Sequence, residues 1–314
     1  MDSIRGVGSF LESNNNAAAD TSAAPLDSFD SDGVTLTDYS NVNSDTNTFV
    51  AWNWKAGGAP TADNSGGQNP TSGSVMIDGS ASTASLAAAD IYPTKMSINT
   101  TSGFSIVKYT GTSSAATYPH GLSQAPELVI NKDLDATGGW PVLNPATTSA
   151  AWIMELQDSA AQYEDSGIWN SLDATPTLVN IGNNSKINYT GREYISYCFH
   201  SVEGYSKVGS YEGNNNADGT FVYTGFRPAW VLIKQIGGTN DWFMTDDKRV
   251  GYNPVGQNWL LANTNAAETT SNDKPYDYLS NGFKFRDSSG YFNDSGSYLY
   301  IAFAKSPFKY SNAR

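Results

Sequence analysis

The protein is a chain of 314 residues with a formal net charge of −13, and only 16% of its residues are charged. Duplex nucleic acid and anionic lipid both attract clustered Lys and Arg, so we expect this acidic chain to bind neither. No stretch approaches the roughly 18 apolar residues of a membrane span, and the N-terminus lacks the apolar core of a secretory signal.

Aromatic residues make up 12% of the chain, whereas disordered chains are poor in them, so the chain is expected to fold. Short aromatic and β-branched runs alternate with Gly, Asn, Asp, Ser and Thr, which is typical of strands joined by turns. The single cysteine, Cys198, leaves no intramolecular disulfide and no cysteine-based zinc site. The composition therefore predicts an all-β fold stabilised by packing.

The first 57 residues predict a short strand after Asp32 and Gly33, a polar loop, and an aromatic strand over residues 48–54. Residues 58–102 are rich in Gly, Ser, Thr and Ala and contain one strand-like run at residues 75–77. We predict that they form a connecting segment.

Residues 103–207 and 208–314 share one longer pattern. In each, a Pro (Pro126 or Pro228) precedes a strand of about seven residues, and a Gly-rich turn and a Trp follow it. The second halves of both units repeat the pattern of residues 1–57. The chain thus resolves into two complete units of about 100 residues and one half unit.

A unit with about seven short strands separated by turns is typical of a β-sandwich, here of jelly-roll-like type. In residues 297–304, Tyr298 and Tyr300 share one face, and Leu299, Ile301 and Phe303 share the other. Both faces are apolar, so we predict a central, buried strand.

The half unit, residues 1–57, would expose apolar side chains and unpaired strand edges if it stood alone. Three arrangements could cover it. Residues 58–102 could supply the missing strands, a neighbouring chain could add them, or the native polypeptide could be longer.

Four stretches resemble the repeat region of large tail-fibre-like virion proteins of marine phages. They are residues 48–57 (TFVAWNWKAG), 103–111 (GFSIVKYTG), 194–207 (YISYCFHSVEGYSK) and 308–314 (FKYSNAR). The similarity covers nearly the whole chain. It implies a virion surface component, such as a tail or head fibre that contacts a marine bacterium, and it supplies no site residues.

Catalytic residues are not expected. His120 lies in a turn and His200 ends an aromatic strand, and no Gly-x-Ser-x-Gly motif flanks either one. A glycan-hydrolysing carboxylate pair is the enzymatic alternative, and its candidates are Glu155, Asp158, Glu164 and Asp165. Acidic loop residues are usually solvated, so we predict a non-enzymatic protein without a cofactor.

Two acidic loops, Asp133 with Asp135 and Asp246 with Asp247, occupy nearly matching positions in the two complete units. Calcium needs six to eight oxygen ligands, and further ligands are not evident. We therefore expect acidic turns and no metal site.

Glycan binding is the remaining candidate, because aromatic rings stack on sugars. Four tryptophans lie near turns and are the candidates for stacking: Trp140, Trp169, Trp242 and Trp259. Four others lie within apolar runs and are predicted to be core residues: Trp52, Trp54, Trp152 and Trp230.

These patterns favour a non-enzymatic, structural virion surface protein, fibre-like, with adhesion to a host-surface glycan. Its expected partners are further copies of itself and other virion proteins, at the virion surface or in an extracellular assembly. The alternative is a self-assembling filament or capsid-decoration protein that uses residues 1–57 as the joint between subunits. A glycan depolymerase is the third hypothesis.

Overall fold

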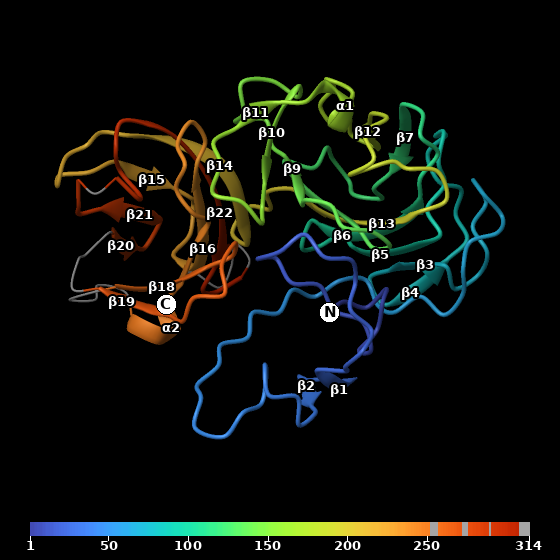
Figure 1. Cartoon of the computed structure of the whole chain (residues 1–314), viewed down its shortest axis with the longest axis horizontal. Helices are drawn as coiled ribbons and strands as arrows, with labels where there is room; N and C mark the ends of the chain where they lie inside the picture. The colour runs from blue at the N-terminus through green and yellow to red at the C-terminus, as the bar shows by residue number, and fades with distance from the viewer. Residues whose placement is uncertain (252–256, 272–275, 289, 308–314) are drawn as a thin grey trace.

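The computed structural model describes residues 1–251, 257–271, 276–288 and 290–307 (Figure 1). Strands dominate, and the two helices of the described residues, α1 (Ser166–Trp169) and α2 (Asp247–Val250), have four residues each. The predicted all-β, sandwich-type fold is confirmed. Within the same residues, no helix is long and apolar enough to cross a membrane.

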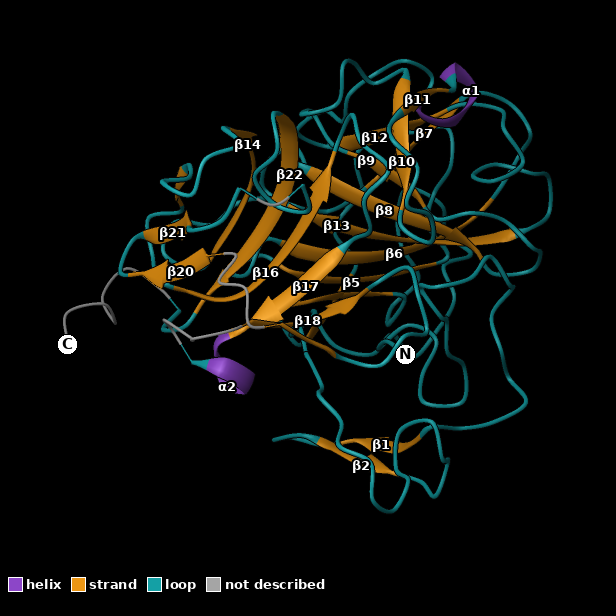
Figure 2. Cartoon of the chain, turned by 60° about the vertical axis from the view of Figure 1, so that its left-hand side comes forward, coloured by secondary structure: helices purple, strands orange, loops and turns teal. Residues whose placement is uncertain are grey.

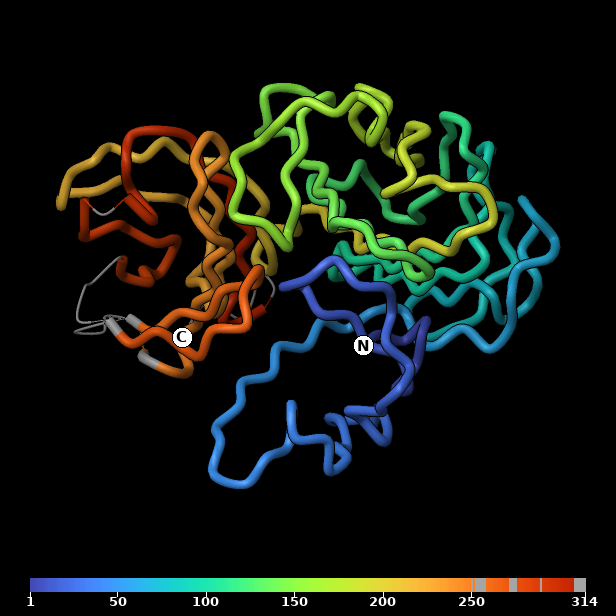
Figure 3. The backbone as a smooth tube through the Cα atoms, in the orientation of Figure 1, coloured from blue at the N-terminus to red at the C-terminus, as the bar shows by residue number. Residues whose placement is uncertain are grey.

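Three lobes follow one another along the chain: an N-terminal lobe (1–57), a middle lobe (58–207) and a C-terminal lobe (208–307). In Figure 1 they appear in blue, in cyan to yellow, and in orange to red. Figure 3 shows the N-terminal lobe below the other two.

The middle lobe has a nine-stranded sheet in the order β11-β10-β9-β8-β13-β6-β5-β3-β4, faced by the pair β12-β7. Its strands are β3 (Val75–Ile77), β4 (Ser80–Ser82), β5 (Lys95–Asn99), β6 (Phe104–Thr110), β7 (Ala116–Pro119), β8 (Leu128–Asp133), β9 (Pro141–Leu143), β10 (Trp152–Glu155), β11 (Tyr163–Glu164), β12 (Leu178–Ile181) and β13 (Glu193–Phe199).

The C-terminal lobe has a six-stranded sheet in the order β14-β22-β16-β17-β18-β19, faced by β15-β21-β20. Its strands are β14 (Ser206–Gly213), β15 (Phe221–Tyr223), β16 (Pro228–Gln235), β17 (Phe243–Asp246), β18 (Gln257–Leu261), β19 (Thr269–Ser271), β20 (Tyr276–Leu279), β21 (Gly282–Phe285) and β22 (Gly296–Ala304). Read from the other end, this order matches β11-β10-β9-β8-β13-β6 strand for strand, so the two lobes repeat one topology.

Each of these lobes has the same stacked tyrosine pair in its core. The rings of Tyr109 and Tyr194 lie 5.3 Å apart in the middle lobe, and those of Tyr211 and Tyr298 lie 4.9 Å apart in the C-terminal lobe. The hydroxyls of Tyr109 and Tyr211 each donate a 2.7 Å hydrogen bond to a backbone carbonyl. A buried tyrosine needs such a partner, and the repeat supplies it twice.

Strand β22 is buried on both faces, as its alternating pattern predicts. Tyr298 and Tyr300 lie in the core between the two sheets of the C-terminal lobe. Leu299 and Ile301 point the other way, into a second core that the lobes share. The strand pairs with β14 on one edge and β16 on the other, so the predicted central position is confirmed.

The shared core joins the outer faces of the two large sheets, which Figure 2 shows set against each other. It contains Leu128, Trp140, Val142, Met154 and Leu156 from the middle lobe, Val208, Trp230, Leu232, Leu299 and Ile301 from the C-terminal lobe, and Leu11, Trp52 and Trp54 packed from the N-terminal lobe. The ring of Trp54 lies 5.3 Å from that of Trp230. All three lobes therefore depend on one core.

Residues 58–102 extend the sheet of the middle lobe. The run at residues 75–77 is β3, and two strands that the sequence did not indicate, β4 and β5, join it. Strand β5 pairs with β3 on one edge and β6 on the other. Within the described residues these strands do not pair with the N-terminal lobe. Residues 58–102 therefore do not supply the strands that residues 1–57 lack.

The N-terminal lobe has one strand pair, β1 (Leu26–Phe29) with β2 (Val34–Leu36). The prediction of a strand over residues 48–54 is wrong, because these residues form no strand. Their counterpart β22 is held on both edges by β14 and β16. Both of those strands belong to the first half of the repeat, which residues 1–57 lack.

Ile301→Ala is expected to lower the free energy of unfolding by about 2–5 kcal/mol, because the truncation leaves a cavity in the core that the lobes share. Urea unfolding followed by tryptophan fluorescence measures it. The control Phe221→Ala, at a side chain 42% exposed on β15, should cost about 1 kcal/mol or less. Equal losses in the two variants would contradict the assignment of Ile301 to this core.

Candidate functional site

The four tryptophans predicted to stack on sugars lie in protein cores. Trp140, Trp169, Trp242 and Trp259 are 5%, 0%, 1% and 9% exposed, respectively. Stacking on a sugar needs an accessible ring face, so this expectation is corrected: the four rings pack against protein. Trp169 lies in the core of the middle lobe, and Trp259 packs on Phe243 and Phe292.

Trp140 and Trp242 do something that the sequence did not indicate: each reaches into a neighbouring lobe together with a buried lysine. In the middle lobe, the Lys132 ammonium donates hydrogen bonds to two carbonyls of its own turn, both at 3.0 Å, and to the Asn16 carbonyl at 3.4 Å. The Trp140 indole N–H donates to the Asn15 carbonyl at 3.0 Å. Asn15 and Asn16 belong to the N-terminal lobe.

The C-terminal lobe repeats this arrangement on the middle lobe. The Lys234 ammonium donates to two carbonyls of its own turn at 2.9 and 3.0 Å and to the Ser159 carbonyl at 3.2 Å. The Trp242 indole N–H lies 3.0 Å from the Glu155 carbonyl and 3.2 Å from the Asp158 carbonyl. We call each lysine and tryptophan pair, Lys132 with Trp140 and Lys234 with Trp242, a clamp.

The repeat explains how each clamp forms. Lys132 and Lys234 are the penultimate residues of β8 and β16, and each tryptophan directly precedes the next strand, β9 or β17. These strands pair antiparallel, so the turn between them brings lysine and tryptophan together. The sequence signal is Lys-x7-Trp, present twice, and it was missed because the lysines end apolar runs and the tryptophans were treated as surface residues.

The segments that the clamps bind are also related in sequence. Residues 11–18 read LESNNNAA and residues 156–161 read LQDSAA. We call them carbonyl loops, because they offer backbone carbonyls to a lysine and an indole.

The clamp lysines are buried, and within the described residues no carboxylate accepts a hydrogen bond from either. Burial lowers the pKa of Lys132 and the pKa of Lys234 to about 8, although neighbouring carboxylates act in the opposite direction. At neutral pH both ammonium groups still carry a proton. Each therefore binds carbonyls as a cation, and a charge-assisted hydrogen bond is stronger than a neutral one.

A second repeated pair fixes the N-terminal lobe on the middle lobe. Asp2 accepts 3.0 Å bonds from the backbone N–H groups of Ile4 and Arg5, and its carboxylate lies 2.6 Å from Arg5 Nε. Arg5 also donates to the Tyr197 hydroxyl on β13 at 3.3 Å. The counterpart is Asp246 with Arg249, also 2.6 Å apart.

The predicted acidic turns cap backbone. Asp246 accepts from the N–H groups of Lys248 and Arg249. Asp133 accepts from those of residues 135 and 136 and lies 3.1 Å from Arg192. In the part of the chain that the structure describes, no cluster of three or more His, Cys, Asp or Glu side chains could hold a metal ion.

The candidate catalytic carboxylates have structural partners. Glu155 lies 2.6 Å from Lys186 and accepts a 3.0 Å bond from the Tyr163 hydroxyl. Asp165 caps α1, Asp158 caps its own turn, and Glu164 is an exposed residue of β11. A general acid must be free to reach a substrate, whereas Glu155 is engaged by Lys186 and Tyr163.

The two histidines also lie in structural settings. His120 Nδ1 accepts from the Leu122 N–H at 3.1 Å, and burial lowers the pKa of His120 to about 4. His200 Nε2 lies 3.5 Å from the Ser123 hydroxyl, and its Nδ1 faces the Gln124 amide. Across the described ranges, no carboxylate hydrogen-bonds to either ring, so neither histidine has the third member of a triad.

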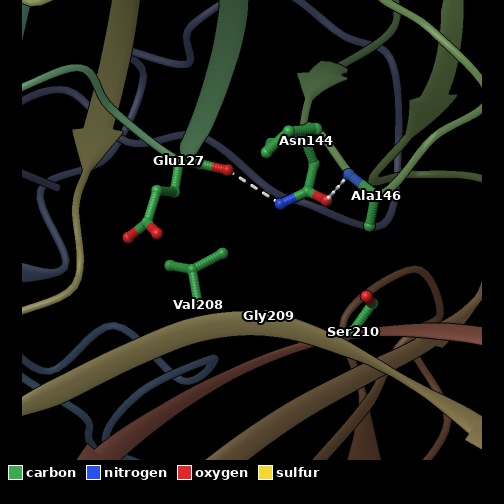
Figure 4. A pocket seen from close by; sticks show the side chains of 7 residues that line it. Glu127, Asn144, Ala146, Val208, Gly209 and Ser210 are labelled. Atoms are coloured by element: carbon green, nitrogen blue, oxygen red, sulfur yellow. Dashed lines mark hydrogen bonds between the residues drawn. The ribbon is translucent and has the colours of Figure 1, made fainter.

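Two hollows of the surface lie near the junction of the middle and C-terminal lobes, and the larger, of about 370 Å³, is lined by residues such as Ser201, Lys207 and Tyr223. The other, of about 190 Å³, lies where the middle and C-terminal lobes meet, lined by residues such as Glu127, Asn144 and Val208. Figure 4 shows the Asn144 amide turned back to the Glu127 carbonyl, a bond of 2.7 Å. The Asn144 amide and the Glu127 carbonyl are thus engaged with each other, and the Glu127 carboxylate accepts from the Ser201 N–H.

Lys234→Met is expected to reduce the gain in stability between pH 8 and pH 10. The folded pKa of about 8 lies below the unfolded value of about 10.4. In this range the unfolded wild-type chain therefore binds more protons, and its free energy of unfolding rises with pH relative to that of the variant. Contributions of other groups, such as Cys198, cancel in this comparison.

Urea unfolding at several pH values between 7 and 10 measures this difference. The control Lys248→Met removes an exposed lysine of α2 and should keep the wild-type pH dependence. A Lys234→Met variant whose stability follows the wild type across this range would show that Lys234 is not desolvated.

Comparison with known proteins matches the chain to a protein family. A family model described as Domain of unknown function (DUF7483) matches residues 1–307, and the match runs through all three lobes. No curated protein and no solved structure matches the chain. Because the family model spans nearly the whole sequence, the chain belongs to the family described as Domain of unknown function (DUF7483).

Proposed function

We propose that this protein is a non-enzymatic structural component of a surface assembly and that it joins another polypeptide through its N-terminal lobe. The observation that carries the proposal is the incompleteness of this lobe. Among the described residues, strand β2 pairs with β1 alone, whereas its counterpart β21 pairs with β15 on one edge and β20 on the other. A free strand edge is a template for pairing with another chain.

The N-terminal lobe also exposes large apolar side chains. Phe29, Leu36 and Phe49 are 47%, 43% and 50% exposed. Leu36 and Phe285 hold matching positions in β2 and β21, and Phe285 is fully buried. The same position of the repeat thus faces a core in one lobe and solvent in the other. Apolar patches of this kind mark interaction sites.

The resemblance of residues 48–57 and 194–207 to tail-fibre-like proteins supports a virion surface as the setting of this assembly. The partners would then be other virion proteins or further copies of the chain. Adhesion to a host glycan lacks such support, because the four tryptophans that the sequence offered for it are buried. The depolymerase hypothesis also lacks support, since Glu155 pairs with Lys186.

The triple variant Phe29→Ser, Leu36→Ser, Phe49→Ser is expected to change the free energy of unfolding by about 1 kcal/mol or less. The reason is that folding of the isolated chain buries little of the apolar surface of these side chains. The triple variant should also reduce the binding of a hydrophobic dye. Phe283→Ser with Phe285→Ser, in the matching strand of the C-terminal lobe, should cost more than about 4 kcal/mol.

Chemical unfolding and dye fluorescence read out both variants. Leu172→Ser with Tyr189→Ser is the matched control, because it removes exposed apolar side chains outside the N-terminal lobe. A stability loss in the triple variant as large as that in the β21 variant would assign the three residues to a finished core and contradict the proposal.

A further inference from the structure

The repeat contains a third carbonyl loop that has no clamp. Residues 261–267 read LANTNAA, which matches residues 11–18 and 156–161. Thr264 and Asn265 hold the positions of Asn15 and Asn16. Among the described residues, no hydrogen bond reaches the carbonyls of Thr264 and Asn265, although the matching carbonyls of both other loops are clamped.

The lobes contact one another in a ring that shows where a third clamp belongs. The middle lobe clamps the loop of the N-terminal lobe, and the C-terminal lobe clamps the loop of the middle lobe. The loop of the C-terminal lobe lies against the N-terminal lobe, where the Ser13 hydroxyl donates to the Ala262 carbonyl at 2.6 Å. The clamp for Thr264 and Asn265 would thus belong to the N-terminal lobe.

A clamp always comes from the first half of a unit, where a strand ends in lysine and a tryptophan starts the next. The N-terminal lobe has only the second half. The same missing half explains three observations: the bare edge of β2, the absence of a strand at residues 48–54, and the unbound carbonyls of loop 261–267. The first two concern the N-terminal lobe and the third concerns the C-terminal lobe, so they support the gap independently.

We propose that the first half of a further unit of the same repeat fills this gap, with a strand that ends in lysine, a Gly-rich turn and a tryptophan in Lys-x7-Trp spacing. This inference rests on the proposed assembly role and names its partner. The incoming strands pair with β2 and with residues 48–54. The incoming lysine and indole bind the carbonyls of Thr264 and Asn265. This is strand addition, with main-chain bonds giving affinity and the clamp giving register.

A second intact copy of the chain does not fit this role. Both of its clamps, Lys132 with Trp140 and Lys234 with Trp242, are already engaged within the chain. Residues 1–57 also carry eight acidic and only two basic side chains, so two N-terminal lobes repel each other. The partner must bring a first half that is free.

The test uses residues 205–248 of this chain, fused to a carrier protein, as the probe. This segment contains β14 to β17 with Lys234 and Trp242. Titration calorimetry with the intact 314-residue chain should show saturable one-to-one binding. A probe with Lys234→Met and Trp242→Phe should bind about tenfold more weakly or worse, because the carbonyls stay unpaired.

Variants of the intact chain provide the other arms. Phe29→Ser, Leu36→Ser, Phe49→Ser should also weaken binding of the probe about tenfold, because the apolar face of the lobe is lost. The control Leu172→Ser with Tyr189→Ser should bind like the wild type. The inference is overturned if binding is not saturable, or if the clamp substitutions leave the affinity of the probe unchanged.

The result also separates this inference from the proposed function. Suppose that the probe does not bind, while the triple variant keeps its free energy of unfolding and binds less hydrophobic dye. The assembly role then stands, and only the identity of the partner is wrong. If sedimentation shows that a second intact copy occupies the lobe in place of the probe, the inference is overturned as well.

Discussion

A β-strand with apolar side chains on both faces needs a neighbour on each edge and a cover on each side, and the whole molecule follows from this constraint. Strands β13 and β22 satisfy it. Each is paired on both edges, and each packs one face in its own lobe and the other in a core between lobes. The shared core is therefore required by the sequence of these two strands. Because of this shared core, the lobes cannot be treated as independent domains.

Apolar burial is not directional, so it does not fix the position of one lobe relative to another. The directional hydrogen bonds of the clamps fix these positions. Burying a lysine ammonium or an indole N–H without an acceptor costs free energy, and the cost is largest for the charged ammonium. In each clamp those acceptors are the backbone carbonyls of a loop from another lobe. A misplaced lobe would leave a buried cation and several carbonyls unpaired. The buried ions Asp2 and Arg5 act in the same way at the N-terminal lobe.

The sequence predicted what depends on local periodicity and failed where the outcome depends on distant neighbours. The prediction of which side chains share each face of residues 297–304 is confirmed, because alternation with a period of two fixes the faces of a strand. Residues 48–54 have a similar pattern yet form no strand, because a pattern does not show whether edge partners exist. Trp140 and Trp242 lie near turns and suggested a surface, but another lobe covers those turns. Strands β4 and β5 were missed because they are short and partly polar. The clamps were detectable in principle, as a lysine and a tryptophan at one spacing in both units.

The central claim is that the N-terminal lobe is a half unit held in place by the other lobes but open at its own edge. Hydrogen–deuterium exchange of the isolated chain, read peptide by peptide, tests it most directly. The account predicts slow exchange in residues 193–199 and 296–304, which are paired on both edges. It predicts fast exchange in residues 48–54, which form no strand, and intermediate exchange in residues 34–36, which pair with β1 on one edge. Protection of residues 48–54 equal to that of residues 296–304 in the isolated chain would show a completed lobe and contradict the account.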